Sequence, residues 1–187
     1  MFYKIKVRTH VRVSPDKFSE DIKKAVLDTL NKQFEGYISK DLGAVIAVSE
    51  ITDIGEGVII SGDGAAYYDT EFNIFTFKPE LQEVVLGKIN DITDFGAFMD
   101  IGPLDGMIHV SQTMDDFVSF SKGNVLTGKE SKKSLKVGDK CRARIIAISY
   151  KDQTSPKIGL TMRQLKLGSL SWIEQDLKKE KKVVKKK

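Results

Sequence analysis

Cysteine, histidine and long apolar runs are all scarce in this chain of 187 residues. The one cysteine, Cys141, has no second cysteine with which to form an internal disulfide, which is typical of a protein kept in a reducing compartment. No run of about 18 apolar residues is present, and residues 1–13 lack the apolar core of a secretory signal. These absences predict a cytoplasmic protein that does not enter a membrane.

Sequence patterns of catalysis and metal binding are also missing. The two histidines, His10 and His109, are far apart in the chain, and no Cys/His spacing of a zinc site occurs. No motif sets a nucleophile beside a base, and the carboxylate pair Asp115–Asp116 falls in a polar stretch where it is expected to be solvated. We therefore expect neither an enzyme nor a bound cofactor or metal.

Charge is unevenly distributed along the chain, although the net charge is only +4. Residues 1–86 hold 10 basic and 14 acidic side chains, residues 87–177 hold 13 and 11, and residues 178–187 hold 7 and 1. This asymmetry predicts an anionic partner for the C-terminal part and a different partner for the acidic N-terminal part. The lysine-rich end fits contact with a phosphate backbone and a solvated tail equally well.

Residues 1–80 predict an α+β domain of the order β-α-β-β-β. Apolar and charged residues alternate from Tyr3 to Val13, as in a strand with one buried side. Residues 14–36 begin with Ser14 as N-cap and Pro15 in the first turn, and they carry an apolar stripe at helical spacing. Three further apolar stretches predict antiparallel strands, at residues 37–54, 57–64 and 65–79.

Four glycines and an aspartate gather near the last two of these strands, namely Gly55, Gly57, Gly62, Asp63 and Gly64. They do not form a dinucleotide-binding loop, because "GDGAAY" lacks the third glycine and leads into a strand rather than a helix. We interpret them as tight turns at the protruding end of a hairpin, which is also suited to docking on another protein.

A second, all-β domain is expected over residues 81–168, and a proline marks the junction between Lys78 and Val85. Its short apolar stretches, separated by turn signals, predict the strands of a small barrel. The polar connection from Thr113 to Lys136 shows no apolar periodicity and is expected to be functional or mobile. Residues 169–187 predict a helix, anchored by its tryptophan, and a lysine-rich tail.

The stretch "DFGAF", residues 94–98, sets Phe95 and Phe98 three positions apart around Gly96. In a regular strand such positions face opposite sides. A bulge at the glycine would bring both rings to the same side. The alternative is that each ring fills the barrel core, which is the commoner place for a phenylalanine.

Alternation in two other strands places polar side chains on the outside of the barrel. The β-branched neighbours of His109 favour the core, so His109 is expected to point outward. In "KCRARIIAIS", Cys141 is expected in the core, with Arg142 and Arg144 outside, where Lys88 joins them. Outward rings beside cations form a platform for single-stranded nucleic acid, because bases stack on ring faces while cations follow the backbone. Taken alone, His109 would be an ordinary surface histidine.

The segments "GKINDITDFGAFMDIGPLDGMIHVSQ", "LKVGDKCRARIIAIS" and "KIGLTMRQ" resemble the S-one RNA-binding motif, a five-stranded OB barrel. The resemblance implies that the two phenylalanines and the histidine contact RNA bases. The chain departs from the family at Ser149, where an acidic residue is common, and the fifth strand opens after an enlarged turn. Together with the outward cations, this gives the expected RNA-binding residues: Lys88, Phe95, Phe98, His109, Arg142, Arg144 and Lys157.

Nearly the whole chain is similar to a narrower family, the archaeal RNA polymerase stalk subunits E-prime and their counterpart, the seventh subunit of eukaryotic RNA polymerase II. The similarity lies in "MFYKIKVRTHVRVSPDKF", "GEGVIISGDGAAYYDTEFNIFTFKPELQEVVLGKI" and "LSWIEQDLKK". It implies a truncated RNP-like N-terminal domain whose tip docks on the polymerase core subunits, and a barrel near the RNA exit. A small helical stalk partner would bind along both domains.

Two alternatives remain open. A different RNA-binding factor with the same barrel, such as an exosome cap protein or a translation initiation subunit, would carry another companion domain. A purely structural adaptor would have a barrel whose RNA face is weak. Both alternatives predict a protein without catalytic residues of its own.

Overall fold

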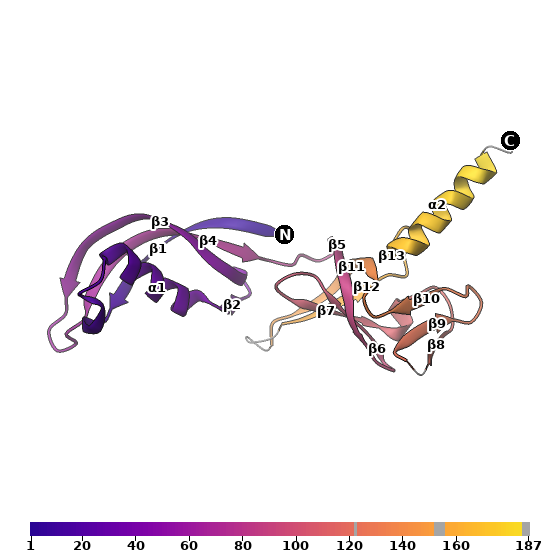
Figure 1. Cartoon of the computed structure of the whole chain (residues 1–187), viewed down its shortest axis with the longest axis horizontal. Coiled ribbons are helices and arrows are strands. Elements are labelled where there is room, and N and C mark those ends of the chain that lie inside the picture. Colours follow the sequence, from indigo (N-terminus) through magenta and orange to yellow (C-terminus); the bar gives the residue numbers. More distant parts are fainter. Residues whose placement is uncertain (122, 152–155, 185–187) are drawn as a thin grey trace. The chain divides into compact units, whose positions relative to one another are not determined.

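The computed structural model describes residues 1–121, 123–151 and 156–184, which belong to two units (Figure 1). The first unit is Met1–Lys78 and the second is Pro79–Lys187. Each unit buries a hydrophobic core of its own. Among the described residues, no helix is both long and apolar enough to cross a membrane.

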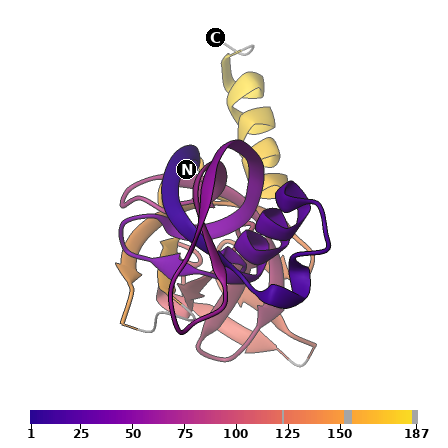
Figure 2. The same cartoon turned by 90° about the vertical axis from the view of Figure 1, so that its left-hand side faces the viewer.

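One helix lies across a four-stranded antiparallel sheet in the first unit (Figure 1, Figure 2). The strands stand in the order β1-β4-β3-β2, and the predicted chain order β-α-β-β-β is confirmed. The elements are β1 (Phe2–Val13), the 3-10 turn η1 (Pro15–Lys17), α1 (Ile22–Phe34), β2 (Ile38–Ser39), β3 (Gly43–Ile59) and β4 (Ala66–Phe77).

The core of the first unit lies between α1 and one face of the sheet. Val26 and Leu30 of α1 are fully buried against Val11 of β1 and against Phe72 and Ile74 of β4. Removing such apolar surface from water is worth roughly 25 cal/mol per Å². The apolar stripe that the sequence shows therefore attaches the helix to the sheet.

The predicted helix over residues 14–36 is wrong in its first turns. Lys17 and Phe18 donate their backbone N–H groups three residues back, to Ser14 and Pro15. This tighter spacing makes a 3-10 turn, and such turns are short. The α-helix begins only at Ile22.

The prediction of two separate strands over residues 37–54 and 57–64 is also wrong, because β3 runs unbroken to Ile59. Its register against β4 shifts between Ile54 and Gly57, and such a bulge absorbs extra residues without ending a strand. A Cβ at Gly57 would lie 2.6 Å from the ring of Tyr68, so the glycine allows the two strands to approach. Gly55 and Gly57 thus belong to a strand, and only the later glycines form the turn.

Five strands of the second unit close into a barrel, which confirms the expected OB-type fold. Around the barrel they stand in the order β12-β7-β6-β5-β11, and β11 pairs back onto β12. Fully buried side chains from four of these strands, among them Ile89, Met99, Ile108 and Ile145, fill its interior. The strands are β5 (Val84–Ile92), β6 (Gly96–Asp100), β7 (Asp105–His109), β11 (Lys140–Ser149) and β12 (Lys157–Thr161).

The long connection after β7 contains regular structure that the sequence did not predict. It begins with the 3-10 turn η2 (Val110–Gln112) and forms a three-stranded antiparallel sheet of β8 (Val118–Ser121), β9 (Val125–Gly128) and β10 (Ser134–Lys136). Leu126 and Leu135 stand opposite each other in this sheet, and both are fully buried. These two leucines form the buried contact between β9 and β10. Because each strand supplies only one of them, the sequence shows no apolar periodicity.

The chain ends in β13 (Gly168–Ser169), which pairs with β11, and α2 (Leu170–Val184). Trp172 anchors the start of α2 as expected. Its ring is buried, and its Nε1 donates a hydrogen bond of 3.2 Å to the carbonyl oxygen of Ser134. Lys133 Nζ lies 5.7 Å from the centroid of that ring. The anchor therefore joins α2 to the three-stranded sheet. The last three lysines, residues 185–187, lie outside the described residues.

Candidate nucleic-acid interface

Phe95 and Phe98 lie beside each other on the outside of the barrel. Their ring centroids are 6.0 Å apart and the ring planes meet at 87°. Phe95 is 47% exposed and Phe98 is half-buried, whereas Ala97 and Met99 on either side of Phe98 are fully buried. The alternative that both rings fill the core is wrong. Because residues alternate along β6, Ala97 and Met99 point into the core and Phe98 points outward.

The expected bulge at Gly96 is not what brings the rings together. Phe95 precedes β6, in a turn closed by a hydrogen bond of 2.8 Å from Thr93 N to the Gly96 carbonyl oxygen. The bulge lies instead in the neighbouring strand β5, between Ile89 and Asp91. Gly96 is needed for another reason, since a Cβ there would lie 2.2 Å from the carbonyl oxygen of Ile108 on β7.

His109 is exposed at the end of β7, directly opposite Gly96. Its Nδ1 lies 2.8 Å from Ser111 Oγ and accepts a longer hydrogen bond of 3.3 Å from Ser111 N. Because a backbone N–H donates to Nδ1, the neutral imidazole carries its proton on Nε2. Ser111 is not among the expected RNA-binding residues, although "HVS" places it two residues after the histidine. We call Phe95, Phe98 and His109 the ring platform.

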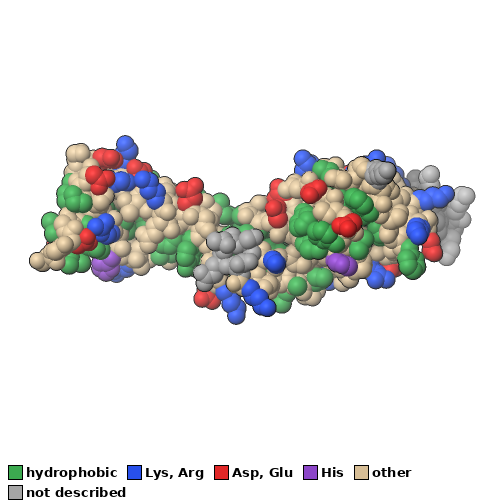
Figure 3. Space-filling view, turned by 90° about the horizontal axis from the view of Figure 1, so that it is seen from below, with side chains coloured by type: hydrophobic (Ala, Val, Ile, Leu, Met, Phe, Trp, Pro, Cys, Tyr) green, Lys and Arg blue, Asp and Glu red, His purple; other side chains and the backbone are tan. Residues whose placement is uncertain are grey.

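An apolar row continues the ring platform across the barrel. Phe98 on β6 stands beside Met107 on β7, and Met107 stands beside Gly159 on β12. Lys157 is exposed two residues before Gly159, so alternation places it on the same outer face. Figure 3 shows a face of the second unit on which hydrophobic side chains gather, with a histidine and both basic and acidic side chains among and around them.

Lys88 and the two arginines occupy different neighbourhoods. Lys88 on β5 is exposed opposite Asp100, which lies two residues after Phe98 on β6. Arg142 and Arg144 are on β11, whose pairing partners are β5, β12 and β13. The structure therefore places Lys157 on β12, a strand of the apolar row, and Lys88 on β5, next to β6, but it does not place the arginines next to the rings.

The side chains of β11 otherwise alternate as predicted. Cys141 is fully buried, and burial first, then the charge of Asp139, raises the pKa of its thiol to about 12. Such a thiol stays protonated and packs as a small hydrophobic group. Arg142 Nη1 reaches the Lys166 carbonyl oxygen at 3.5 Å. The Nε of Arg144 is buried and has no hydrogen-bond partner among the described residues.

The turn between β3 and β4 forms the end of the first unit, and we call residues 58–65 the tip. Val58, Ile59 and Ile60 are each more than half exposed there. Gly62 and Gly64 adopt φ values of +93° and +69°, which favour glycine. The expected docking residues include the glycines but not these apolar residues, although "GVII" contains three in a row. The tip therefore offers aliphatic surface to a partner.

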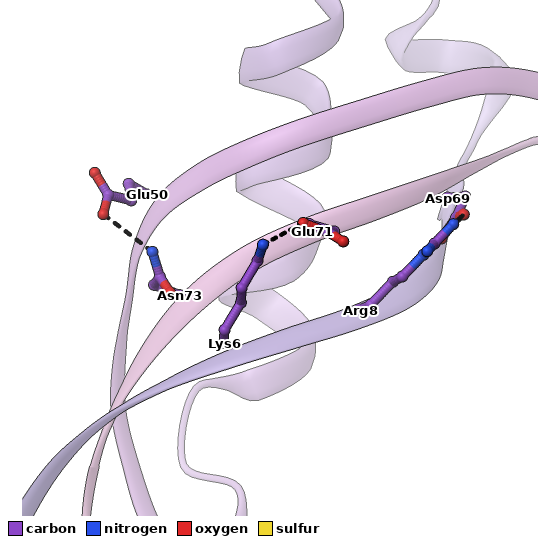
Figure 4. A network of polar contacts seen from close by, with 6 residues as sticks. All are labelled: Lys6, Arg8, Glu50, Asp69, Glu71 and Asn73. Carbon is purple, nitrogen blue, oxygen red and sulfur yellow. Dashed lines mark hydrogen bonds and ion pairs between the residues drawn. The ribbon is translucent and has the colours of Figure 1, made fainter.

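Basic side chains on the outer face of the first sheet are paired with carboxylates (Figure 4). Lys6 Nζ lies 2.5 Å from Glu71 Oε2, and the guanidinium of Arg8 contacts Asp69 through two nitrogens. In the same face, Glu50 accepts from Asn73 at 3.0 Å and from the Lys4 ammonium at 2.7 Å. A phosphate backbone would have to compete with these carboxylates. The paired cations therefore favour the second unit as the RNA-binding part.

Two family models match successive parts of the chain. Residues 8–64 match "SHS2 domain found in N terminus of Rpb7p/Rpc25p/MJ0397", and residues 78–155 match "S1 RNA binding domain". DNA-directed RNA polymerase subunit Rpo7 of Saccharolobus solfataricus is 39% identical over 180 residues, which cover 95% of this chain and 100% of the relative. The chain belongs to the Rpo7 family. The resemblance inferred from the sequence is thus confirmed.

The match to the Rpo7 family covers nearly the whole chain. Subunit Rpo7 of Sulfolobus acidocaldarius is 35% identical over 183 residues, covering 97% of this chain and 100% of the relative. DNA-directed RNA polymerase III subunit RPC8 of Saccharomyces cerevisiae is 32% identical over 114 residues, covering 61% of this chain and 54% of the relative. The match of the first unit to an Rpb7-type domain disfavours the exosome and translation-factor alternatives, which predict another companion domain.

Proposed function

We propose that this chain is a non-catalytic stalk subunit of a DNA-directed RNA polymerase, and that its barrel binds nascent single-stranded RNA while its tip docks on the polymerase core. Such a subunit works where the polymerase does, which is the cytoplasm in a cell without a nucleus. The observation that carries the RNA-binding part is the ring platform, whose two phenylalanines and histidine come together outside the core.

Single-stranded RNA can use each part of this face differently. Unstacked bases stack on Phe95 and Phe98, where each base gains roughly 1–3 kcal/mol. His109 offers the Nε2 proton as a hydrogen-bond donor to a base or a phosphate. Lys88 and Lys157 attract the phosphate backbone in a salt-dependent manner. Ser149, opposite Lys157, supplies a hydroxyl where the S-one family often has a carboxylate, so it adds no repulsion.

Protein partners explain the exposed apolar side chains that lie outside the ring platform. The aliphatic residues of the tip fit an apolar pocket on the polymerase core. Phe2 in the first unit and Leu86 in the second are also well exposed. A small helical stalk partner that covers both units would remove these two side chains from water. Large exposed apolar side chains of this kind favour such a protein contact.

Two matched variants test the proposal in a reconstituted polymerase. Replacing Val58, Ile59 and Ile60 by serine is expected to abolish recovery of the core subunits and to leave RNA affinity unchanged. Replacing the three ring-platform residues by alanine is expected to do the reverse. Full RNA affinity in the ring-platform variant would leave only the structural adaptor. Full recovery of the core by the tip variant would disprove docking through the tip.

A further inference from the structure

A hollow of about 490 Å³ lies in the second unit, between the end of β7 and the three-stranded sheet of the long connection. Ser111 of η2 lines one side, Phe117 just before β8 and Val118 at its start line another, and Arg163 after β12 lies in the wall as well. Sites that hold small organic molecules fall in the range of roughly 300–1,000 Å³. The hollow is therefore large enough for an aromatic base.

The hollow adjoins the ring platform through Ser111. Ser111 lines it, and the hydroxyl of Ser111 lies 2.8 Å from Nδ1 of His109. One residue thus belongs to the wall of the hollow and supports the last member of the ring platform. A strand of RNA whose bases stack on Phe95 and Phe98 would meet the hollow immediately beyond His109.

The hollow offers an aromatic face. Phe117 is 77% exposed, which is unusual for a phenylalanine in a folded unit. Every nucleobase has a flat face that stacks on such a ring. The exposed ring is therefore explained if a base covers it.

The polar wall of the hollow suits a base better than a phosphate. Asp115 has a side chain that is 75% exposed, and Arg163 contacts it through Nη2 at 2.7 Å and Nε at 2.8 Å, both on Oδ1. Asp116 accepts hydrogen bonds of 2.8 Å from both N and Oγ of Ser131, which lowers its pKa and keeps it ionised. Glu130 adds a third carboxylate. This concentration of negative charge repels phosphate and favours donor groups.

We propose that the hollow receives one unstacked nucleobase of the bound RNA and prefers guanine, with Phe117 stacking on the base and the Asp115 carboxylate accepting from its Watson–Crick edge. The proposal rests on the RNA-binding function proposed above. Guanine presents N1–H and N2–H side by side, and a carboxylate accepts two parallel donors. Arg163 holds the carboxylate in place by donating from Nε and Nη2 to Oδ1, which leaves both lone pairs of Oδ2 to accept the two donors of the base.

The test measures binding of the full chain to RNA of about twelve nucleotides by fluorescence anisotropy. One oligonucleotide is all uridine, and in the others a single guanosine is moved along the uridine sequence. Inosine replaces guanosine in a third set, because it lacks the N2 amino group. Asp115→Asn is matched by Asp53→Asn, which removes the same charge from the first unit. Phe117→Ala is matched by Phe120→Ala, an exposed ring of β8 that does not line the hollow.

The native chain is expected to bind RNA with guanosine at one position about tenfold more tightly than all-uridine RNA. Inosine should recover only part of this gain. Asp115→Asn should remove the preference without changing affinity for all-uridine RNA, and Phe117→Ala should weaken binding to every oligonucleotide. The two control variants should behave as the native chain. Because Asp115 and Phe117 are exposed, neither substitution disturbs a core.

Absence of a guanosine preference at every position, or its retention by Asp115→Asn, would overturn the inference. Unchanged RNA affinity in Phe117→Ala would also overturn it. If Phe117→Ala in addition recovered less polymerase, the hollow would be a contact for another protein. Replacing Phe95 and Phe98 by alanine separates the two proposals. If that variant loses RNA affinity while Phe117→Ala does not, the ring-platform proposal is supported and the hollow proposal is rejected. If Phe117→Ala loses RNA affinity while the double variant does not, the ring-platform proposal is rejected.

Discussion

Arg12 on β1 binds the carboxylate of Asp63 in the turn between β3 and β4 through two parallel hydrogen bonds. Nη2 donates to Oδ1 at 2.6 Å and Nε donates to Oδ2 at 3.0 Å. Tyr67 adds a hydrogen bond of 2.5 Å from its hydroxyl to Oδ2. Arg12 first, and then Tyr67, lower the pKa of Asp63 from 3.8 to about 2. The turn that carries the aliphatic tip is therefore tied to the first strand of the sheet.

Asp63→Asn is expected to loosen the tip and to reduce recovery of polymerase core subunits, because an amide cannot accept the paired guanidinium donors as a carboxylate does. The effect on folding should be small, since the pair is exposed to solvent. Asp53→Asn on β3 serves as the control with the same charge change. If the native chain and Asp63→Asn recovered the same amount of polymerase core subunits, the geometry of the tip would not limit docking.

The same carboxylate predicts a pH dependence of stability. Its pKa is lower in the folded chain than the ordinary 3.8, so the ionised group stabilises the fold above about pH 4, and this contribution disappears as the pH falls towards 2. Urea unfolding followed by circular dichroism should therefore show a small difference between the native chain and Asp63→Asn at about pH 6, and this difference should disappear near pH 2. A constant difference at both pH values would contradict the assignment.

Phe95→Ala and Phe98→Ala should each weaken binding of single-stranded RNA by about tenfold, because each ring stacks on a base. The double variant should lose less than the product of the two, since the rings touch at a centroid distance of 6.0 Å and act together. Titration of labelled RNA measures all three affinities. Phe18→Ala, at a ring of the first unit that is 48% exposed, should bind as the native chain does. Strictly multiplicative losses would mean that the rings hold separate bases independently.

Salt dependence should distinguish the lysines from the arginines. Lys157→Ala is expected to lower RNA affinity regardless of sequence and to reduce the slope of log affinity against log salt by about one. Arg142→Ala should change the slope less, because β11 does not neighbour the strands that carry the rings. Both variants lose one positive charge, so they control for each other. A larger change for Arg142→Ala would mean that RNA also follows β11.

Gly96→Ala should destabilise the second unit by about 1–3 kcal/mol, because the added Cβ would lie 2.2 Å from the carbonyl oxygen of Ile108. Gly159→Ala is the milder comparison, since its Cβ would lie 3.2 Å from the Cβ of Ala147. Urea unfolding at neutral pH gives both free energies. If Gly96→Ala were as stable as the native chain, the close approach of β6 and β7 would not depend on glycine.

Local patterns predicted the elements of this chain well where one physical requirement dominates. Alternation identified β1 and placed Cys141 in the core, because each strand position faces either the interior or water. The outward position of the two rings was predicted correctly, but the reason given for it, a bulge at Gly96, was wrong. A turn before β6, closed between Thr93 and Gly96, does what a bulge was expected to do. Both geometries put an exposed residue before a glycine, so the sequence alone does not separate them.

Features that depend on contacts between distant segments were not predictable. The break between η1 and α1, the unbroken course of β3 past Gly57, and the sheet formed around Leu126 and Leu135 all depend on partners elsewhere in the chain. The neighbours of Arg142 could not be predicted from the sequence for the same reason. Its outward direction follows from alternation, whereas the strands beside it follow from barrel closure.

Trp172 is the only tryptophan in the sequence, and it is buried against the second unit. Ultraviolet emission excited at the indole therefore reports on that unit alone, whereas backbone dichroism reports on both. Comparing the two signals during one denaturant titration shows whether the first and second units unfold separately. The chain thus carries its own probe for cooperativity between its halves.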